Sequence, residues 1–384
     1  MITRDIAYIG VDDTDLDLFE SQYIIPNGIS YNSYLIKDEK IAIMDTADNR
    51  KIDEWLGNLR TAHDGRTPDY LVVQHMEPDH AGCIAEILEE YPAIKIVASA
   101  RAIQMMPQFF EGKDFSQNTI AVKEGDTLSL GEHILQFFMA PMVHWPEVMV
   151  TYDKKDKVVF SADGFGKFGA LSHEEDWACE ARRYYFNICG KYGGPVQALL
   201  KKLATLDVEC ICPLHGPILK ENLGYYIGLY DTWSKYDVET EGVFIAYASI
   251  HGGTAAVANV MAEILREKGA KKVSVADLNR DDMAEAIEDA FRMDKMIVAA
   301  ASYDGGVFPV MHDFLHHLQI KAYQKRRVGI IENGSWAPCA GRVMRGMLEQ
   351  MKDVEIAEPM VTILSRMKQS DRAALEALAD AILK

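Results

Sequence analysis

Hydrophobic and polar positions follow two different rhythms along the chain, and the change falls near residue 242. Beyond it, short apolar runs alternate strictly with longer segments in which apolar residues recur at helical spacing. The runs predict strands at 243–248, 272–276, 295–300, 327–331 and 354–356, and the intervening segments predict helices at about 254–268, 281–292, 308–319, 339–351 and 370–383. Strands joined by helical crossovers form a parallel sheet, so this half is predicted to be a doubly wound, five-stranded α/β domain.

The first half lacks this simple alternation. Short β-rich runs at 33–36 and 41–44 come first, and a buried strand at 70–73 precedes a helix at 81–90. Strands then fill 120–162, and a further one is predicted at 208–212. The pattern predicts two sheets sandwiched between helices. We therefore expect a first domain over residues 1–241, ending in a helical connector at about 221–241, and a second domain over 242–384.

Composition narrows the range of partners. The chain has 384 residues, of which 48% are hydrophobic, and its 40 basic and 58 acidic residues give a net charge of −18. A surface this negative repels both nucleic acid and anionic membrane leaflets, so neither is an expected partner.

Membrane and secretion signals are also missing from the sequence. No run approaches the roughly 20 apolar residues that span a bilayer. The N-terminal MITRDIAYIG does not resemble a secretory signal. Six dispersed cysteines favour reduced, buried thiols rather than a disulfide scaffold, so we expect a cytoplasmic protein.

Four potential metal ligands fall within six residues of one segment: His75, Glu77, Asp79 and His80. The segment follows the strand at 70–73 and precedes a predicted helix. Imidazole nitrogen and carboxylate oxygen are the donors that transition metals take in proteins. Short polar turns can also have this composition, so the interpretation depends on further ligands elsewhere.

Three such residues occur at the ends of distant apolar strands: His144, Asp163 and His215. Each enters a loop marked by Gly or Pro, and ligands at strand ends can converge on one edge of a sandwich. The other histidines are not expected to bind metal. His63, His133 and His173 are predicted to be solvated, and His312, His316 and His317 to lie on a surface or interface helix.

The pattern His-x-Glu-x-Asp-His, followed by His144, Asp163 and His215, resembles the metallo-β-lactamase fold. Hydrolases of that fold usually carry His-x-His-x-Asp-His and bind zinc. Glu77 in place of the second histidine, together with His144-Trp-Pro and Asp163-Gly-Phe-Gly, resembles the flavodiiron proteins, or A-type flavoproteins. Carboxylates favour ferric and bridged states more than imidazole does, which independently tilts the site from zinc toward iron.

This resemblance covers nearly the whole chain and implies an N-terminal αββα metallo-β-lactamase-like sandwich followed by a flavodoxin-like domain. It also implies that His75, Glu77 and His144 bind one iron and that Asp79, His80 and His215 bind the other, with Asp163 bridging. The same residues would then form the catalytic, non-haem diiron centre. The spacing of these residues does not by itself give that partition.

A second candidate site begins where the strand at 243–248 ends. Its residues are Ser249, Ile250, His251, Gly252, Gly253 and Thr254. Backbone amides, hydroxyls and a helix N-terminus can hold phosphate in such a loop. It is neither a P-loop nor a dinucleotide motif, and it resembles the FMN-phosphate loop of flavodoxins, with His251 at a position that usually carries a hydroxyl.

Two further loops follow later strands of the same predicted sheet, at the edge where such folds bind ligands. Their candidate residues are Ser302, Tyr303, Asp304, Gly305 and Gly306 in one, and Asn333, Gly334, Ser335, Trp336 and Ala337 in the other. Glycines let the backbone approach a flat ring, and Trp336 can cover one face of an isoalloxazine. The sequence therefore predicts an FMN site.

The resemblance implies an oxidoreductase of electron transport that reduces O2 to water, NO to nitrous oxide, or both. It also implies a head-to-tail homodimer, or a homotetramer, that places the FMN of one subunit against the irons of another. The sequence has no Cys-x-x-Cys pair, so we expect a separate electron donor such as a rubredoxin-like protein, a deazaflavin or a reductase.

Two alternatives remain open at this point. One is a zinc-dependent hydrolase of metallo-β-lactamase type with a regulatory flavodoxin-like domain, and Glu77 argues against it. The other is a non-enzymatic flavin electron carrier or redox sensor with a structural metal loop, and the full set of ligands argues against it. Metal content and gas turnover discriminate among the three.

Overall fold

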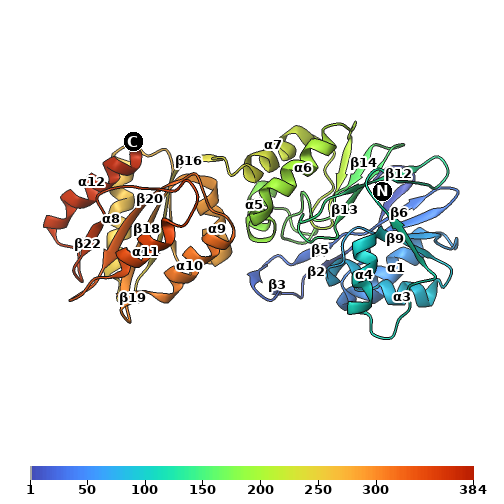
Figure 1. Ribbon diagram of the computed structural model, residues 1–384, viewed down its shortest axis with the longest axis horizontal. Coiled ribbons are helices and arrows are strands. Elements are labelled where there is room, and N and C mark those ends of the chain that lie inside the picture. The colour runs from blue at the N-terminus through green and yellow to red at the C-terminus, as the bar shows by residue number, and fades with distance from the viewer. Residues whose placement is uncertain (1) are drawn as a thin grey trace. The chain divides into compact units, whose positions relative to one another are not determined.

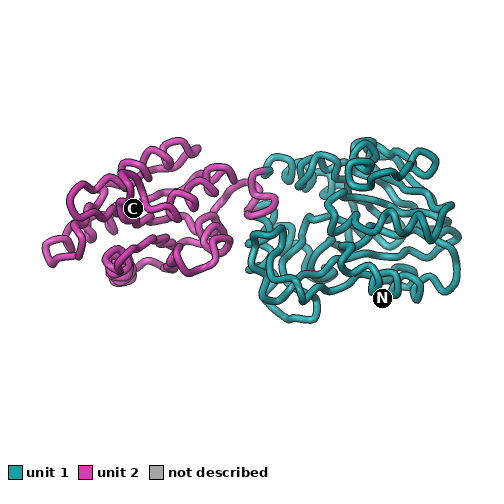
Figure 2. The backbone as a smooth tube through the Cα atoms, turned by 90° about the horizontal axis from the view of Figure 1, so that it is seen from below, with its two compact units in different colours: residues 1–185, 192–231 teal, residues 186–191, 232–384 magenta. Residues whose placement is uncertain are grey.

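A computed structural model describes residues 2–384, which form two compact units (Figure 2). Unit 1 comprises the described residues up to 185 together with 192–231, and unit 2 comprises residues 186–191 and 232–384. None of the helices within residues 2–384 has the length and apolar character needed to cross a membrane.

Two sheets form the centre of unit 1. The first has the order β1-β6-β7-β8-β9-β10, with bounds Ile6–Tyr8, Tyr34–Lys37, Ile41–Met44, Tyr70–Val73, Lys95–Ser99 and Thr119–Val122. The second has the order β11-β12-β13-β14-β15, with bounds Thr127–Ser129, Ile134–Met139, Met149–Asp153, Val158–Phe160 and Cys210–Cys212. Two small ribbons pair β2 (Val11–Asp13) with β5 (Ile29–Tyr31) and β3 (Leu18–Phe19) with β4 (Tyr23–Ile24).

The two sheets pack against each other through alternate positions on each strand, because residues two apart point to the same face. One buried cluster joins Tyr34, Ile36, Ala42, Met44, Val72 and Val97 of the first sheet to Leu135, Phe137, Met149, Val158, Phe160, Cys210 and Cys212 of the second. The helices of this part are α1 (Ile52–Ala62), α2 (Pro78–Ala81), α3 (Ile84–Glu90), α4 (Ala100–Phe109), α5 (Trp177–Ile188), α6 (Gly193–Leu203) and α7 (Leu223–Ser234). Helices α1, α3 and α4 lie beside the first sheet and α6 beside the second (Figure 1). The predicted αββα sandwich is confirmed.

Unit 2 is built on one sheet of order β17-β16-β18-β20-β21, in which these strands run parallel. Its strands are β16 (Thr240–Ala248), β17 (Val273–Asp277), β18 (Met293–Tyr303), β19 (Gly306–Val307), β20 (Arg327–Asn333), β21 (Glu355–Ile356) and β22 (Val361–Ile363). β22 continues the edge of β21 along β20, so the predicted fifth strand is divided into two pieces. β19 adds a short antiparallel hairpin to β18. The order, with the second strand at one edge, is that of flavodoxin-like sheets.

Helices cover both faces of this sheet. They are α8 (Gly253–Glu267), α9 (Met283–Arg292), α10 (Pro309–Ile320), α11 (Ala340–Leu348) and α12 (Arg372–Leu383). Helices α8 and α12 share one buried cluster with the strands, through residues such as Met261 and Leu378. Short 3₁₀ turns at Asn49–Lys51, Gly190–Tyr192 and Gln369–Asp371 complete the elements. The predicted doubly wound α/β architecture is confirmed.

The division between the units differs from the predicted boundary at residue 241, because residues 232–241 group with unit 2. Arg326 supplies the physical reason. This arginine is 2% exposed, and its guanidinium donates to the carbonyl oxygens of Tyr236 (2.9 Å), Asp237 (3.1 Å) and Phe291 (2.6 Å). The connector is thus tied to unit 2 by polar contacts that hydrophobic periodicity does not register.

Two elements end earlier or begin later than predicted. The helix expected at 81–90 is divided between α2 and α3. Gly82 lies at the break and allows close packing there, since a Cβ at this position would lie 2.5 Å from the carbonyl oxygen of Pro78 and 2.9 Å from the Asn49 nitrogen. The strand expected to continue to Val143 ends at Met139. His144 therefore lies within the loop between β12 and β13, and not at a strand end.

Candidate metal centre and ligand pocket

The loop after β8 positions the first four predicted ligands. His75 follows the buried strand directly, and Pro78 begins the short helix α2. Proline suits the first turn of a helix because its φ is already helical. His75, Asp79 and His80 are buried, and only 14% of the Glu77 side chain is exposed.

The other three predicted ligands come from loops of the second sheet. β14 and β15 are parallel neighbours with Phe160 opposite Cys212. Asp163 and His215 each follow three residues after these positions, so they leave the same edge of the sheet. His144 joins them from the loop between β12 and β13, and all three are buried. The structure thus brings all seven predicted residues together.

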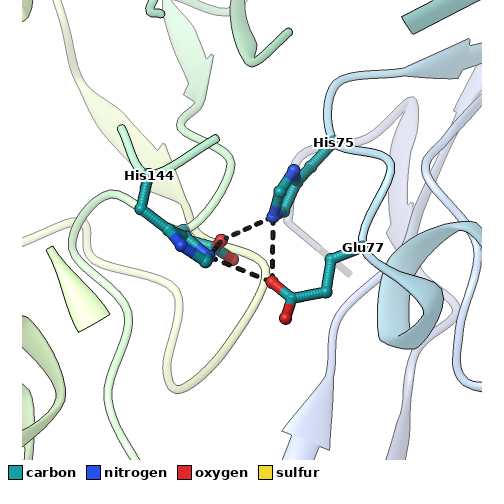
Figure 3. A group of neighbouring side chains, drawn as sticks. His75, Glu77 and His144 are labelled. Carbon is teal, nitrogen blue, oxygen red and sulfur yellow. Dashed lines mark hydrogen bonds and ion pairs between the residues drawn. The ribbon is translucent and has the colours of Figure 1, made fainter. Parts of the chain in front are cut away.

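The first donor group consists of His75, Glu77, His144 and Asp163. Figure 3 labels the first three. Glu77 Oε2 lies 3.1 Å from His75 Nε2 and 3.0 Å from His144 Nε2. Asp163 Oδ2 lies 3.2 Å and 3.1 Å from the same two nitrogens. Two imidazole nitrogens and two carboxylate oxygens therefore converge on one point.

Asp79, His80 and His215 form the second donor group. Asp79 Oδ2 lies 3.3 Å from Nε2 of each histidine, and these two nitrogens are 3.1 Å apart. The other oxygen of Asp163, Oδ1, lies 3.3 Å from His80 Nε2 and 3.8 Å from His215 Nε2. One carboxylate therefore faces both groups, with one oxygen toward each.

Electrostatics within the site are dominated by this shared carboxylate. Burial disfavours charge on His144, yet the neighbouring carboxylates of Asp163 and Glu77 raise the His144 pKa to about 9. Burial likewise disfavours the Asp163 anion, but the surrounding imidazoles, His75 foremost, hold the Asp163 pKa well below its usual range. The carboxylates thus favour positive charge at this point, and a metal cation ligated by neutral imidazoles would supply it.

The donor set fits two metal ions. Both carboxylate oxygens of Asp79 and of Asp163 are buried and lack a hydrogen-bond partner among residues 2–384. Leaving such oxygens unsatisfied is costly, and a bound cation satisfies them. Four imidazoles and three carboxylates are an appropriate mixture of donors for iron.

Residues outside the predicted set orient two of the imidazoles. Glu147 Oε1 lies 2.8 Å from His75 Nδ1 and accepts the Met76 N–H at 2.9 Å. The carbonyl oxygen of Ser30 lies 2.7 Å from His215 Nδ1. These contacts place the Nδ1 protons outward and leave Nε2 free to ligate. The sequence signal for Glu147 was its place three residues after His144.

Asn32 supports the His215 loop from behind. Its buried amide donates to the carbonyl oxygens of Pro213 (2.8 Å) and Gly216 (2.7 Å), on either side of the histidine. Tyr8 in turn donates to the Asn32 oxygen at 3.0 Å. No local pattern in the sequence indicated this role, since the partners are more than 180 residues apart.

The prediction that His133 and His63 are solvated is wrong. His133 is fully buried, and its Nδ1 lies 3.0 Å from Asp153 Oδ2. His63 is 9% exposed and lies 3.1 Å from the Tyr91 hydroxyl. Both histidines lie beside partners from distant segments, which their polar sequence surroundings did not reveal. His173 is exposed, as predicted.

Unit 2 contains a pocket of about 660 Å³ at the carboxyl ends of β16, β18 and β20. All the predicted flavin-contacting residues line it except Gly252 and Gly306. Gly252 instead precedes α8 with a left-handed φ of 81°, and Gly306 lies in β19. Ala301, Cys339, Ser365 and Arg366 also line the pocket and were not predicted.

The pocket has features that suit a flavin nucleotide. Ser249 Oγ, on the loop before α8, is buried without a hydrogen-bond partner among the described residues. Thr254 is 2% exposed in the first turn of α8. Trp336 is 91% exposed at the rim, so its indole is available to cover a ring. Hydroxyl donors at a helix start and a free aromatic face are the parts that a phosphate and an isoalloxazine need.

Comparison with known proteins places these observations in a family. Residues 29–216 match the family model described as "ODP family beta lactamase". The rubredoxin oxygen:oxidoreductase of Desulfovibrio gigas has the same fold along the whole chain, with a TM-score of 0.93, 26% identity, and coverage of 100% of this chain and 97% of that one. The chain belongs to the flavodiiron proteins. The predicted family is therefore confirmed.

Relatives of known sequence agree with this membership. The anaerobic nitric oxide reductase flavorubredoxin of Escherichia coli is 28% identical over 88% of this chain and 72% of its own length. A putative diflavin flavoprotein of Synechocystis is 29% identical over 96% of this chain, which spans 64% of that protein, less than two thirds. Flavodiiron proteins are oxidoreductases that carry FMN and a diiron centre, and the two donor groups and the pocket of this chain fit both cofactors.

Proposed function

We propose that this flavodiiron protein reduces O2 to water, NO to nitrous oxide, or both, with electrons that enter at FMN. The observation that carries the proposal is the placement of Asp163, whose two carboxylate oxygens face two separate groups of imidazole and carboxylate donors. A structural metal loop needs no such shared carboxylate. Two-metal hydrolases can share one in the same way, so the distinction from a hydrolase rests on Glu77, which adds an oxygen donor where the zinc-binding pattern carries histidine. Similarity to an oxygen reductase and to a nitric oxide reductase supports both gases as candidate substrates.

The seven residues of the centre have distinct roles in this proposal. His75, Glu77 and His144 would hold one iron, and Asp79, His80 and His215 the other, with Asp163 shared between them. Bound iron supplies one-electron redox chemistry and a place for the gas, and FMN supplies electrons that it accepts in pairs and releases singly. Glu147 and the Ser30 carbonyl oxygen hold the imidazoles of His75 and His215 with Nδ1 turned away from the centre.

Residues of the unit 2 pocket would bind the flavin. The loop from Ser249 to Thr254 would hold the phosphate, and the loops from Ser302 and from Asn333 would enclose the ring system, with Trp336 against one face. Because Ser249 Oγ has no partner in the described residues, it can donate a hydrogen bond to a phosphate oxygen without breaking an existing one.

The assembly and the electron source are part of the same proposal. A head-to-tail homodimer, or a tetramer built from it, would bring one subunit's FMN near another's irons. The exposed side chains of Ile250, Tyr303 and Trp336 around the flavin pocket offer apolar area for such a contact. A donor that is rubredoxin-like, a deazaflavin or a reductase would deliver the electrons. The six cysteines form no disulfide within residues 2–384, and such reduced thiols favour a cytoplasmic location.

The decisive experiment measures iron, zinc and FMN per chain and then compares O2 and NO consumption with a reducing donor. We expect two irons and one FMN, with turnover of at least one gas. Replacing Asp163 with Asn should reduce iron content and turnover together, whereas the exposed His173→Asn should change neither. Zinc without iron, together with ester or thioester cleavage, would favour the hydrolase. Flavin cycling without gas consumption would favour a carrier or sensor.

A further inference from the structure

The unit 2 pocket includes a segment that follows β22 and was not predicted to touch the flavin. Ser365 and Arg366 both line the pocket. β22 runs parallel to β20, with Asn333 opposite Ile363, so the residues after both strands emerge at the same edge of the sheet. The segment at 364–367 therefore lies where the predicted flavin loops lie.

Specific contacts fix this segment against the phosphate loop. The side-chain amide of Asn333 donates to the Ser365 carbonyl oxygen at 2.9 Å, and the Ser365 N–H donates to Asn333 Oδ1 at 3.1 Å. A Cβ at Gly253 would lie only 2.5 Å from that same carbonyl oxygen, so glycine lets the two segments meet. Gly253 begins α8. The backbone of Arg366 is thus anchored one residue away from the start of the phosphate-binding helix.

The Arg366 side chain is exposed and available. No hydrogen bond or ion pair engages its guanidinium within residues 2–384, and only its carbonyl oxygen is used, by Lys368 at 3.4 Å. It is also the one lysine or arginine among the described residues that line the pocket, and Asp304 is the one acidic residue there. Elsewhere in unit 2, arginines such as Arg327 and Arg372 are already paired with glutamates.

The phosphate loop needs additional positive charge. FMN carries a phosphate dianion, and this chain has a net charge of −18, which disfavours bound anions. The loop itself offers Ser249 Oγ, Thr254 and the amides at the start of α8, but His251 replaces a hydroxyl donor. A helix N-terminus contributes about half a unit of positive charge, less than the ligand requires.

We propose that the guanidinium of Arg366 pairs with the phosphate of FMN and makes the pocket selective for phosphorylated flavin over riboflavin. The inference rests on the proposed flavin site of unit 2 and assigns that site's specificity. Arginine suits the task because its planar fork can donate two parallel hydrogen bonds to phosphate oxygens. In this proposal Arg366 supplies the hydrogen bond to phosphate that a hydroxyl residue at position 251 would otherwise donate. It also adds a positive charge, which a hydroxyl does not carry.

The test uses full-length protein from which flavin has been removed, titrated separately with FMN and riboflavin and followed by quenching of flavin fluorescence. Arg366→Ala should weaken FMN binding at least tenfold and change riboflavin binding less than twofold. Arg366→Lys should fall between wild type and Arg366→Ala, because it keeps the charge but not the fork. Added salt should weaken FMN binding to the wild type more than to Arg366→Ala.

Arg372→Ala is the matched control, because it removes the same charge from an exposed position of unit 2 that does not line the pocket. It should leave both affinities unchanged. If Arg366→Ala lost affinity for FMN and for riboflavin equally, the guanidinium would lie at the ring system and the assignment would be overturned. Unchanged FMN binding in that variant would overturn it as well. If the wild type bound neither flavin, the proposed flavin site would fail together with this assignment.

Discussion

Glu147 offers the sharpest test of how the metal centre is held, because it lies outside the predicted ligand set. Its Oε1 lies 2.8 Å from His75 Nδ1 and accepts the Met76 N–H at 2.9 Å, and the carboxylate is fully buried. His75 thereby has a fixed ring orientation before any metal arrives. Glu147 in turn is anchored at its own carbonyl oxygen by Ser99 Oγ at 2.8 Å.

Two substitutions separate orientation from stability. Glu147→Gln keeps an acceptor oxygen but removes the charge that favours the Nδ1 proton. Loss of such a partner typically weakens metal binding 10- to 100-fold, or about 1.4–2.7 kcal/mol. Glu147→Ala leaves two buried N–H donors without an acceptor, at about 1–3 kcal/mol each, so unfolding should become easier by about 2–6 kcal/mol.

The assay follows iron release to a competing chelator and, separately, denaturant unfolding of the metal-free chain. Glu147→Gln should release iron more readily while unfolding nearly as the wild type does. Glu132→Gln is the control, since Glu132 is exposed and forms an ion pair with Lys155 at the surface. Iron affinity of Glu147→Gln within twofold of wild type would refute the role assigned to the His75–Glu147 contact.

Three further outcomes are expected. Glu77→His should shift the metal content of purified protein from iron toward zinc, because it restores the His-x-His-x-Asp-His pattern and removes a carboxylate, as elemental analysis would show. Arg326→Met should lower the free energy of unfolding by about 2–4 kcal/mol in denaturant, since it strips donors from several buried carbonyl oxygens. Burial opposes charge on His133, but Asp153 beside it raises the His133 pKa in the folded protein. The pair therefore contributes its whole stabilisation of the fold below pH about 6.5, the pKa of an unfolded histidine, and loses it as the pH rises through the folded pKa. His133→Gln should remove that pH-dependent part of the unfolding free energy.

Each of these outcomes has a control or a contrary result. Retained iron in Glu77→His, at wild-type stoichiometry, would show that the carboxylate does not select the metal. Arg372→Met, at an exposed position, should lower the free energy of unfolding by less than about 0.5 kcal/mol. If Arg326→Met lowered it by no more than this, the hydrogen bonds of Arg326 would not hold the connector to unit 2. If His133→Gln and wild type lost stability in parallel as pH rises, the His133–Asp153 pair would not be the titrating element.

Local sequence patterns determined the architecture and most of the candidate chemistry. Strict alternation of apolar runs and helical segments was sufficient for the parallel sheet of unit 2, because each strand and helix carries its own periodicity. The ligands from His75 to His80 are visible because they are adjacent in the chain. Glycine-rich turns after strands marked the flavin loops for the same reason, since the conformation they require is local.

Tertiary structure decided what depends on distant segments. The position of Asp163 between two donor groups follows from the parallel pairing of β14 and β15, which no spacing in the sequence encodes. The burial of His133 beside Asp153 and the approach of Arg366 to the α8 start are likewise products of strand pairing. Periodicity reports which face of an element is apolar, whereas the partners of a polar side chain are set by which elements pack together. That is why the ligands could be named from the sequence, while their grouping and their supporting contacts required the fold.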